Sequence, residues 1–151
     1  MGLKARHDVP KIKKRDGIGN TGCSSDQHPF FSFRYMTANA GHSAAFARSL
    51  ALAERVQVLD GLYAAIERIS SKPWAYWGNL PRKSGYETIA YSEIRFSAAN
   101  DAKLTGDTKM NVFRFDTHLG TGKGRIIGFK DSPCSAFYVI GYDFDFSAYS
   151  H

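Results

Sequence analysis

The chain has 151 residues, 43% of them hydrophobic and 23% charged, with a net charge of +6 at neutral pH. This length and composition predict a single globular domain with its own hydrophobic core. The chain contains no run of about 18 apolar residues, so no membrane-spanning helix is predicted. No apolar segment that would make a signal peptide follows the basic N-terminus, so a cytoplasmic protein is expected.

Residues 1–27 are expected to form a basic, flexible arm, and residues 28–151 a single α+β domain. The arm holds six Lys or Arg residues against three Asp, and little that could build a core. Its KIKKR run could contact phosphate or simply be solvated. The basic balance permits an RNA, a DNA or an acidic protein as partner without demanding one, the alternative being a solvated surface with a positive tail. Cys23 and Cys134 match no metal-ligand spacing and are interpreted as reduced thiols.

The first regular elements are a strand and a helical stretch. Alternating Phe31, Phe33 and Tyr35 predict a strand over residues 29–36. Residues 43–71 then predict helix, with Ser43 as N-cap and an apolar stripe expected in the core, made of Leu52, Val56, Leu59, Tyr63 and Ile66.

Two features of the helical stretch predict where it bends and where it ends. Asp60-Gly61 is expected to bend it or divide it into two helices, and Pro73 to end it. Trp74, Trp77 and Tyr86 follow. They are interpreted as sealing the junction between helices and sheet, the alternative being an RNA-stacking surface beside Arg82 and Lys83.

The second half of the chain predicts mainly strands. One is expected around residues 86–94, followed by a polar stretch, 97–109, that reads as a loop or a short excursion. Strands over 110–116, 124–131 and 135–146 are bounded by Gly, Asp, Pro or Ser and predict an antiparallel meander, with TGKG as a hairpin turn. The expected fold is a two-layer α+β fold, with the helical pair packed on one face of an antiparallel sheet.

The segments VFRFDTHLGTGKGRIIGF and AFYVIGYDFDFSAY resemble the central and last strands of the RelE/ParE-like superfamily of small bacterial toxins. FFSFRYM, LPRKSGYETI and the FYVIGYDFDFSAYSH ending resemble a family of small mobile-element proteins, over residues 29–96 and 110–151. The resemblance implies a toxin-like module. It also implies RNA or the ribosome as target and an antitoxin-like protein as partner.

Matched residue by residue, the resemblance places Arg125 at the arginine that binds phosphate in ribosome-dependent mRNA endonucleases. It places Tyr149 at their C-terminal aromatic residue. The chain departs from those enzymes after the last strand, where Asp143-Phe144-Asp145 replaces a basic cluster. The resemblance therefore implies the fold more directly than it implies RelE-type catalysis.

Metal-free RNA cleavage needs a base, an acid and cations for the phosphorane charge. His151 and Tyr149 are the candidate acid–base residues, with Asp143 to orient the imidazole. Arg125 completes the catalytic set. The candidate substrate-binding residues are Arg114, Lys123, Arg82 and Lys83.

A simpler interpretation stays open beside this site. In it His151 lies on a fraying chain end, and Arg114 is an exposed sheet residue. His28, His42 and His118 are interpreted as surface or structural groups. Asp143 and Asp145 would share a strand face, but no third ligand is evident, and neither a metal nor a cofactor is expected.

Two functions of different classes follow. The first is a toxin-like module of a mobile element, acting as a metal-free endoribonuclease or as an inhibitor of a cellular target. The second is a non-enzymatic binding or adaptor protein, for example a homodimer, because the aromatic sheet offers surface for an interface.

Overall fold

The computed structural model describes residues 27–130 and 136–150. Nearly all of the predicted arm with its KIKKR run, both cysteines and His151 lie outside these ranges. The described residues form three α-helices, α1 (Ala44–Ser49), α2 (Leu52–Ser70) and α3 (Trp74–Gly78). Short 3-10 helices, η1 to η4, span Ala40–His42, Arg82–Ser84, Tyr91–Glu93 and Asn100–Ala102.

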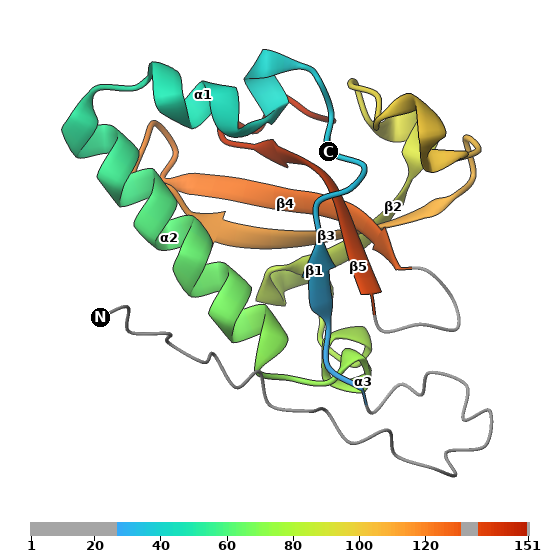
Figure 1. The fold of residues 1–151 in the computed structure, drawn as a ribbon. Helices are drawn as coiled ribbons and strands as arrows, with labels where there is room; N and C mark the ends of the chain where they lie inside the picture. Colours follow the sequence, from blue (N-terminus) through green and yellow to red (C-terminus); the bar gives the residue numbers. More distant parts are fainter. Residues whose placement is uncertain (1–26, 131–135, 151) are drawn as a thin grey trace, which may run out of the picture.

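Five strands form one sheet, in the order β1-β5-β4-β3-β2 (Figure 1). Their bounds are β1 Phe30–Ser32, β2 Tyr86–Ala90, β3 Lys109–Asp116, β4 Lys123–Lys130 and β5 Ala136–Asp143. Neighbours from β2 to β5 are antiparallel, whereas β1 runs parallel to β5. The α+β class is confirmed. The expectation of a wholly antiparallel sheet is wrong, because the chain crosses from β1 to the opposite edge before the meander begins.

The three C-terminal strands and the hairpin between β3 and β4 were predictable from alternation and turn residues, and both are confirmed. In that hairpin Thr117 N–H donates to the Gly122 carbonyl at 2.9 Å. The first strand is much shorter than expected. Only three residues pair with β5, and the chain turns at Arg34 and Tyr35.

The helical stretch divides at a different place from the one predicted. It breaks at Leu50 and Ala51, after α1, and α2 runs unbroken through Asp60 and Gly61. Ser43 caps α1 as expected, its Oγ accepting from Ala45 N–H at 3.3 Å. The reason for the unbroken helix lies at Gly61. A Cβ there would lie 1.9 Å from the Asp116 carbonyl oxygen, so glycine lets the helix lie directly on the end of β3.

The apolar stripe predicted to enter the core is for the most part exposed. Leu52, Val56, Leu59 and Tyr63 are 72%, 58%, 43% and 63% exposed, and only Ile66 packs partly against the core. A second stripe with the same spacing takes the core positions, formed by Val58, Leu62, Ala65 and Ile69. Periodicity alone does not distinguish two such stripes on one helix.

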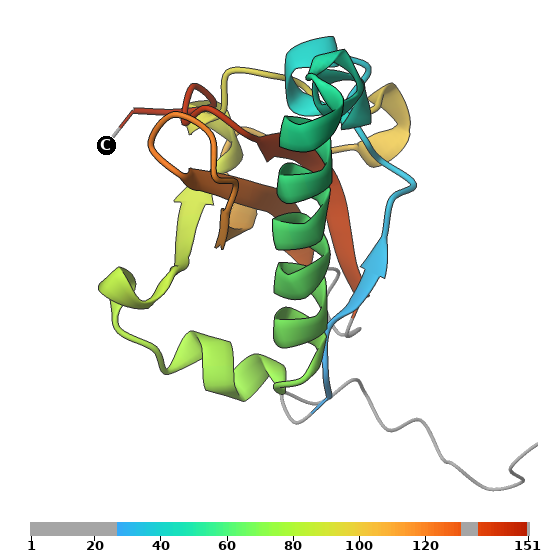
Figure 2. The same ribbon diagram turned by 90° about the vertical axis from the view of Figure 1, so that its left-hand side faces the viewer.

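Each face of the sheet has its own core. Figure 2 shows α2 lying across one face, where Trp74 and Trp77 close the junction as predicted, with the Trp77 and Phe113 ring centroids 5.1 Å apart. On the other face, Met110 and Val112 meet Phe96 and Ala98, from the chain after β2. Part of the polar stretch 97–109, predicted as a loop or short excursion, thus covers the second face of the sheet.

Within the described ranges, no helix combines the length and the apolar character needed to cross a membrane.

Candidate functional site

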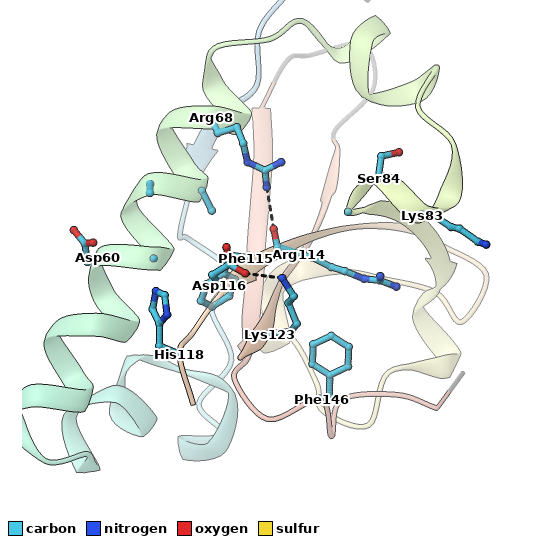
Figure 3. Close-up of a pocket in the computed structure, with 14 residues that line it drawn as sticks. Asp60, Arg68, Lys83, Ser84, Arg114, Phe115, Asp116, His118, Lys123 and Phe146 are labelled. Carbon is cyan, nitrogen blue, oxygen red and sulfur yellow. Dashed lines mark hydrogen bonds and ion pairs between the residues drawn. The ribbon is translucent and has the colours of Figure 1, made fainter. Parts of the chain in front are cut away.

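A pocket of about 790 Å³ opens at the end of the sheet where β3 stops and β4 starts (Figure 3). Its wall comes from α2, from the 3-10 turn before β2, from the β3–β4 hairpin and from the C-terminal segment. The lining residues are Asp60, Gly61, Ala64, Ala65, Arg68, Lys83, Ser84, Gly85, Arg114, Phe115, Asp116, His118, Lys123 and Phe146.

Hydrogen bonds to main-chain carbonyls hold these walls together. Arg68, on the last turn of α2, donates from Nη2 to the Arg114 carbonyl at 3.0 Å. Arg114 N–H in turn donates to the Gly85 carbonyl at 2.8 Å, which ties β3 to the turn before β2. Gly85 has φ +90°, a conformation that favours glycine. The walls of the pocket are therefore joined by hydrogen bonds to the main chain of β3 and of the turn before β2.

The pocket carries more positive than negative side chains. Four basic residues line it, against Asp60 and Asp116. In Figure 3, Asp60 and Lys83 lie at opposite rims, with Arg114 and Lys123 between them. Arg114 Nη2 lies 3.6 Å from Glu87 Oε1, with 34% of the arginine side chain exposed. A positive pocket of this kind favours an anionic ligand.

Lys123 and Asp116 form the best-defined ion pair of the pocket. Lys123 Nζ donates to Asp116 Oδ1 at 2.7 Å, and both side chains are more than half exposed. The hydrogen bond from Lys123 lowers the pKa of the Asp116 carboxyl, opposed by its partial desolvation. An exposed pair exchanges partners at little cost, so Lys123 is available to an incoming anion.

Two pocket residues have unusual backbone conformations. His118 (φ 59°) and Phe146 (φ 63°) are, with Lys103, the non-glycine residues of the described chain with positive φ. Such strain gathers at functional sites more often than elsewhere. His118 is an exposed imidazole on the hairpin, and Phe146 presents a half-buried ring to the pocket.

The structure gives Arg125 and Asp143 a role different from the predicted one. Both side chains have no exposed surface, and Arg125 Nη1 donates to Asp143 Oδ2 at 2.8 Å. The guanidinium carbon lies 3.8 Å from the Phe146 ring centroid and 3.9 Å from that of Tyr149. Arg125 is thus enclosed between two rings, where no phosphate reaches it, and Asp143 holds Arg125.

Tyr149 is also buried, with 3% of its surface exposed. Its hydroxyl donates to Glu87 Oε1 at 2.6 Å, and the pKa of the phenol is raised, chiefly by desolvation and then by this hydrogen bond. A phenol in this state is a poor acid near neutral pH. The C-terminal segment therefore acts as a cover over Arg125, and through Glu87 it contacts Arg114.

Asp145 does not share a strand face with Asp143, because β5 ends at Asp143. Its Oδ1 accepts from Ser147 Oγ at 2.6 Å and Ser147 N–H at 3.2 Å. The Ser147 hydroxyl is the main cause of the lowered pKa of the Asp145 carboxyl. The two aspartates thus stabilise the turn that leads Phe146 and Tyr149 back over the sheet.

Three of the predicted substrate-binding residues, Arg114, Lys123 and Lys83, line the same pocket. Arg82 lies in the adjoining 3-10 turn, but its side chain is outside the description, as is His151. His42 is structural as interpreted, since its Nδ1 donates to the Tyr142 carbonyl at 3.0 Å and its ring stacks on Phe96.

Sequence reasoning did not identify Arg68, His118 and Phe146 as pocket residues. Arg68 carried only the signal of a basic residue in the last turn of a helix, which is common. For His118 and Phe146 the signal is backbone strain, which is visible in the structure and not in the pattern of residues.

We expect stability to fall at alkaline pH because desolvation raises the pKa of several tyrosine phenols, Tyr149 among them. Burial raises the pKa of both Tyr86 and Tyr142 to about 12. Because the pKa of each phenol is higher in the folded than in the unfolded protein, each contributes to the free energy of unfolding. This contribution is complete below about pH 10, the pKa of tyrosine in the unfolded chain, and is lost as the pH rises toward about 12.

Urea unfolding at pH 8, 10 and 11, together with titration of tyrosinate absorbance, measures this loss. Tyr142→Phe should flatten the alkaline decline, whereas Tyr63→Phe, at a residue that is 63% exposed, should not. Equal profiles for the wild type and Tyr142→Phe would contradict the expectation.

Among residues 27–130 and 136–150, no group of three or more His, Cys, Asp or Glu side chains is placed to hold a metal ion.

Comparison of the chain with protein-family models, with curated proteins and with solved structures finds no significant match.

Proposed function

We propose that this protein is a toxin-like, cytoplasmic module of a mobile element that binds single-stranded RNA through the pocket described above. The observation that carries the proposal is the gathering of Arg68, Lys83, Arg114 and Lys123 around one opening. Because these side chains come from α2, the turn before β2 and the β3–β4 hairpin, only the folded chain brings them together.

The chemistry of the pocket suits a nucleotide unit. Arginine and lysine bind phosphate oxygens, and a phenylalanine ring can stack on a base. Phe146 lies at the same opening as Arg114 and Lys123. A volume of about 790 Å³ lies in the range of ligand pockets. One phosphate with its base would therefore find both kinds of contact.

If the bound RNA is cleaved, His118 is the side chain proposed to exchange protons with it. Histidine is the side chain most often used as a general acid or base, and His118 is exposed at the pocket while Tyr149 is buried. The cations would stabilise charge on the phosphorane. Without cleavage, the same contacts would block a cellular RNA or ribosomal surface, which is the inhibitor form of the proposal.

Binding of a labelled, mixed-sequence RNA 12-mer tests the proposal. Replacing Arg114 and Lys123 together by alanine should weaken binding at least about tenfold, because each charge-assisted hydrogen bond contributes about 1.5–3 kcal/mol. The slope of log affinity against log salt should fall by about 0.7 for each lost phosphate contact.

Lys109→Ala is the matched control. Lys109 is exposed and lies on the same strand as Arg114, but it does not line the pocket. It should change affinity less than about twofold. Equal losses in the control and the double variant would mean that binding is diffuse, and absence of binding by the wild type would contradict the proposal.

Induced expression in a bacterium tests the toxin-like part. The wild type should arrest growth, and the Arg114→Ala, Lys123→Ala variant should relieve the arrest. His118→Ala distinguishes cleavage from blocking. It should preserve transcripts if the protein is an endoribonuclease and leave the arrest unchanged if it is an inhibitor.

A non-enzymatic binding protein is the second candidate, and the exposed apolar face of α2 favours it. In that case the partner would be a protein, an antitoxin-like chain or a second copy, rather than RNA.

A further inference from the structure

We propose that two copies of this chain associate through α2, whose exposed apolar residues form the seam of a parallel two-stranded coiled coil. This inference goes beyond RNA binding and does not depend on it. The residues that carry it are Leu52, Val56, Leu59 and Tyr63, which are between 43% and 72% exposed.

The spacing of these four residues is that of a coiled-coil seam. The steps from 52 to 56, 59 and 63 are four, three and four, and Ile66 continues the series after three more. Residues with this spacing occupy the a and d positions of a heptad, with Val56 and Tyr63 at a and Leu52 and Leu59 at d. Isolated exposed apolar residues are common on protein surfaces, but four in this register form a continuous row.

The described part of the protein leaves this row exposed. The core face of α2 is formed by Val58, Leu62, Ala65 and Ile69, and Gly61 contacts β3. In this heptad scheme Val58 and Ala65 at c and Gly61 at f lie away from the seam, whereas Leu62 and Ile69 at g lie at its edge. In Figure 1, α1 and α3 extend from the two ends of α2 toward the sheet, and in Figure 2 no other described segment lies in front of α2. Among the described residues, the row is therefore accessible to a second helix from the side of α2 opposite Gly61.

Charges beside the row select the occupant and its direction. Asp60 and Glu67 occupy e positions on one side of the seam, and Arg55 occupies a g position on the other. In an antiparallel pair, the acidic row of one copy would face that of the other. In a parallel pair, a g residue faces the e residue five positions later in the partner. Arg55 of each copy then faces Asp60 of the other.

Contacts within its own chain fix the position of Arg55. Its Nη2 donates to the carbonyls of Arg48 and Leu50 at 2.8 and 3.1 Å, which fixes the guanidinium beside the first turn of α2. The helix therefore carries both members of the ion pair on opposite sides of its apolar row, as a parallel pair of identical helices requires.

Sedimentation velocity of the full chain, from about 1 to 100 μM, measures the association. The wild type should pass from monomer to dimer, and Val56→Glu should remain monomeric throughout. Gln57→Glu adds the same charge at an exposed neighbouring position outside the seam and should still dimerise. Circular dichroism checks that both variants fold. A wild type that stays monomeric at 100 μM, or a Val56→Glu variant that still dimerises, would overturn the proposal.

Cysteine cross-linking measures the direction of pairing. In a background with Cys23→Ser and Cys134→Ser, Val56→Cys should form an intermolecular disulfide, because a positions of parallel helices lie opposite each other. Gln57→Cys should not. A dimer that fails to cross-link through Val56→Cys would exclude the parallel arrangement. RNA affinity of Val56→Glu should equal that of the wild type, so the two proposals fail separately.

Discussion

Replacing Arg125 by alanine is expected to lower the free energy of unfolding by about 3–5 kcal/mol. The substitution leaves Asp143, which has no exposed surface, without its ion-pair partner. It also removes the cation enclosed between the rings of Phe146 and Tyr149. A buried carboxylate without a compensating charge is far more costly than the loss of a surface ion pair. Urea denaturation at pH 7 measures the difference.

Two comparisons make the expectation specific. Arg114→Ala removes an arginine that is the cross-strand neighbour of Arg125 but is partly exposed, and it should cost less than about 1 kcal/mol. Replacing both members of the buried pair, with Arg125→Met and Asp143→Leu, should recover most of the loss, because no isolated charge then remains. If Arg125→Ala and Arg114→Ala cost the same, the buried pair is not what stabilises the C-terminal segment.

The same pair shows what a resemblance leaves out. The match of short motifs placed Arg125 at a phosphate-binding position, and the needs of metal-free RNA cleavage placed Asp143 beside an imidazole. In the pairing of β4 with β5, Arg125 lies opposite Asp143, and the chain after β5 folds back over both residues. Whether an arginine on a strand faces a ligand or a carboxylate depends on what covers that face. Here the cover is a segment whose turn rests on Asp145 and Ser147, a contact that residue spacing does not reveal.

The strands were predictable because each carries its own signal, namely alternation bounded by turn residues. The helix was predictable as a helix but not in its orientation. Val58 and Val56 are two positions apart on α2, yet one is fully buried and the other is 58% exposed. Both belong to stripes of equal spacing, so the choice between them is made by the partner surface. The substrate-binding set was partly predictable, since cations near a hairpin come together when the hairpin closes.

The expected break at Asp60-Gly61 illustrates the opposite error. Glycine lowers helix propensity, and for that reason the pair was interpreted as a bend. In the folded protein the missing side chain is what matters, since α2 meets the main chain of β3 at this residue. Close approach is a tertiary requirement, and it overrides a local preference of less than about 1 kcal/mol.

Gly61→Ala is therefore expected to destabilise the protein, although glycine to alanine within a helix ordinarily stabilises by about 0.5–1 kcal/mol. The new Cβ would lie 1.9 Å from the Asp116 carbonyl oxygen and 3.1 Å from its carbonyl carbon. Backbone atoms cannot rotate away as a side chain can, so α2 must move from the sheet. Overpacking of this kind costs about 1–3 kcal/mol. Thermal and urea unfolding measure the loss.

Gly78→Ala provides the matched control, because Gly78 is also helical and a Cβ there meets nothing within 4 Å. It should be neutral or slightly stabilising. Since Gly61, Arg68 and Asp116 line one pocket, the Gly61→Ala variant should also bind RNA more weakly, as the helix carrying Arg68 moves away from the hairpin carrying Lys123. A Gly61→Ala protein as stable as Gly78→Ala would mean that α2 does not lie against β3 as closely as the contact at Asp116 requires.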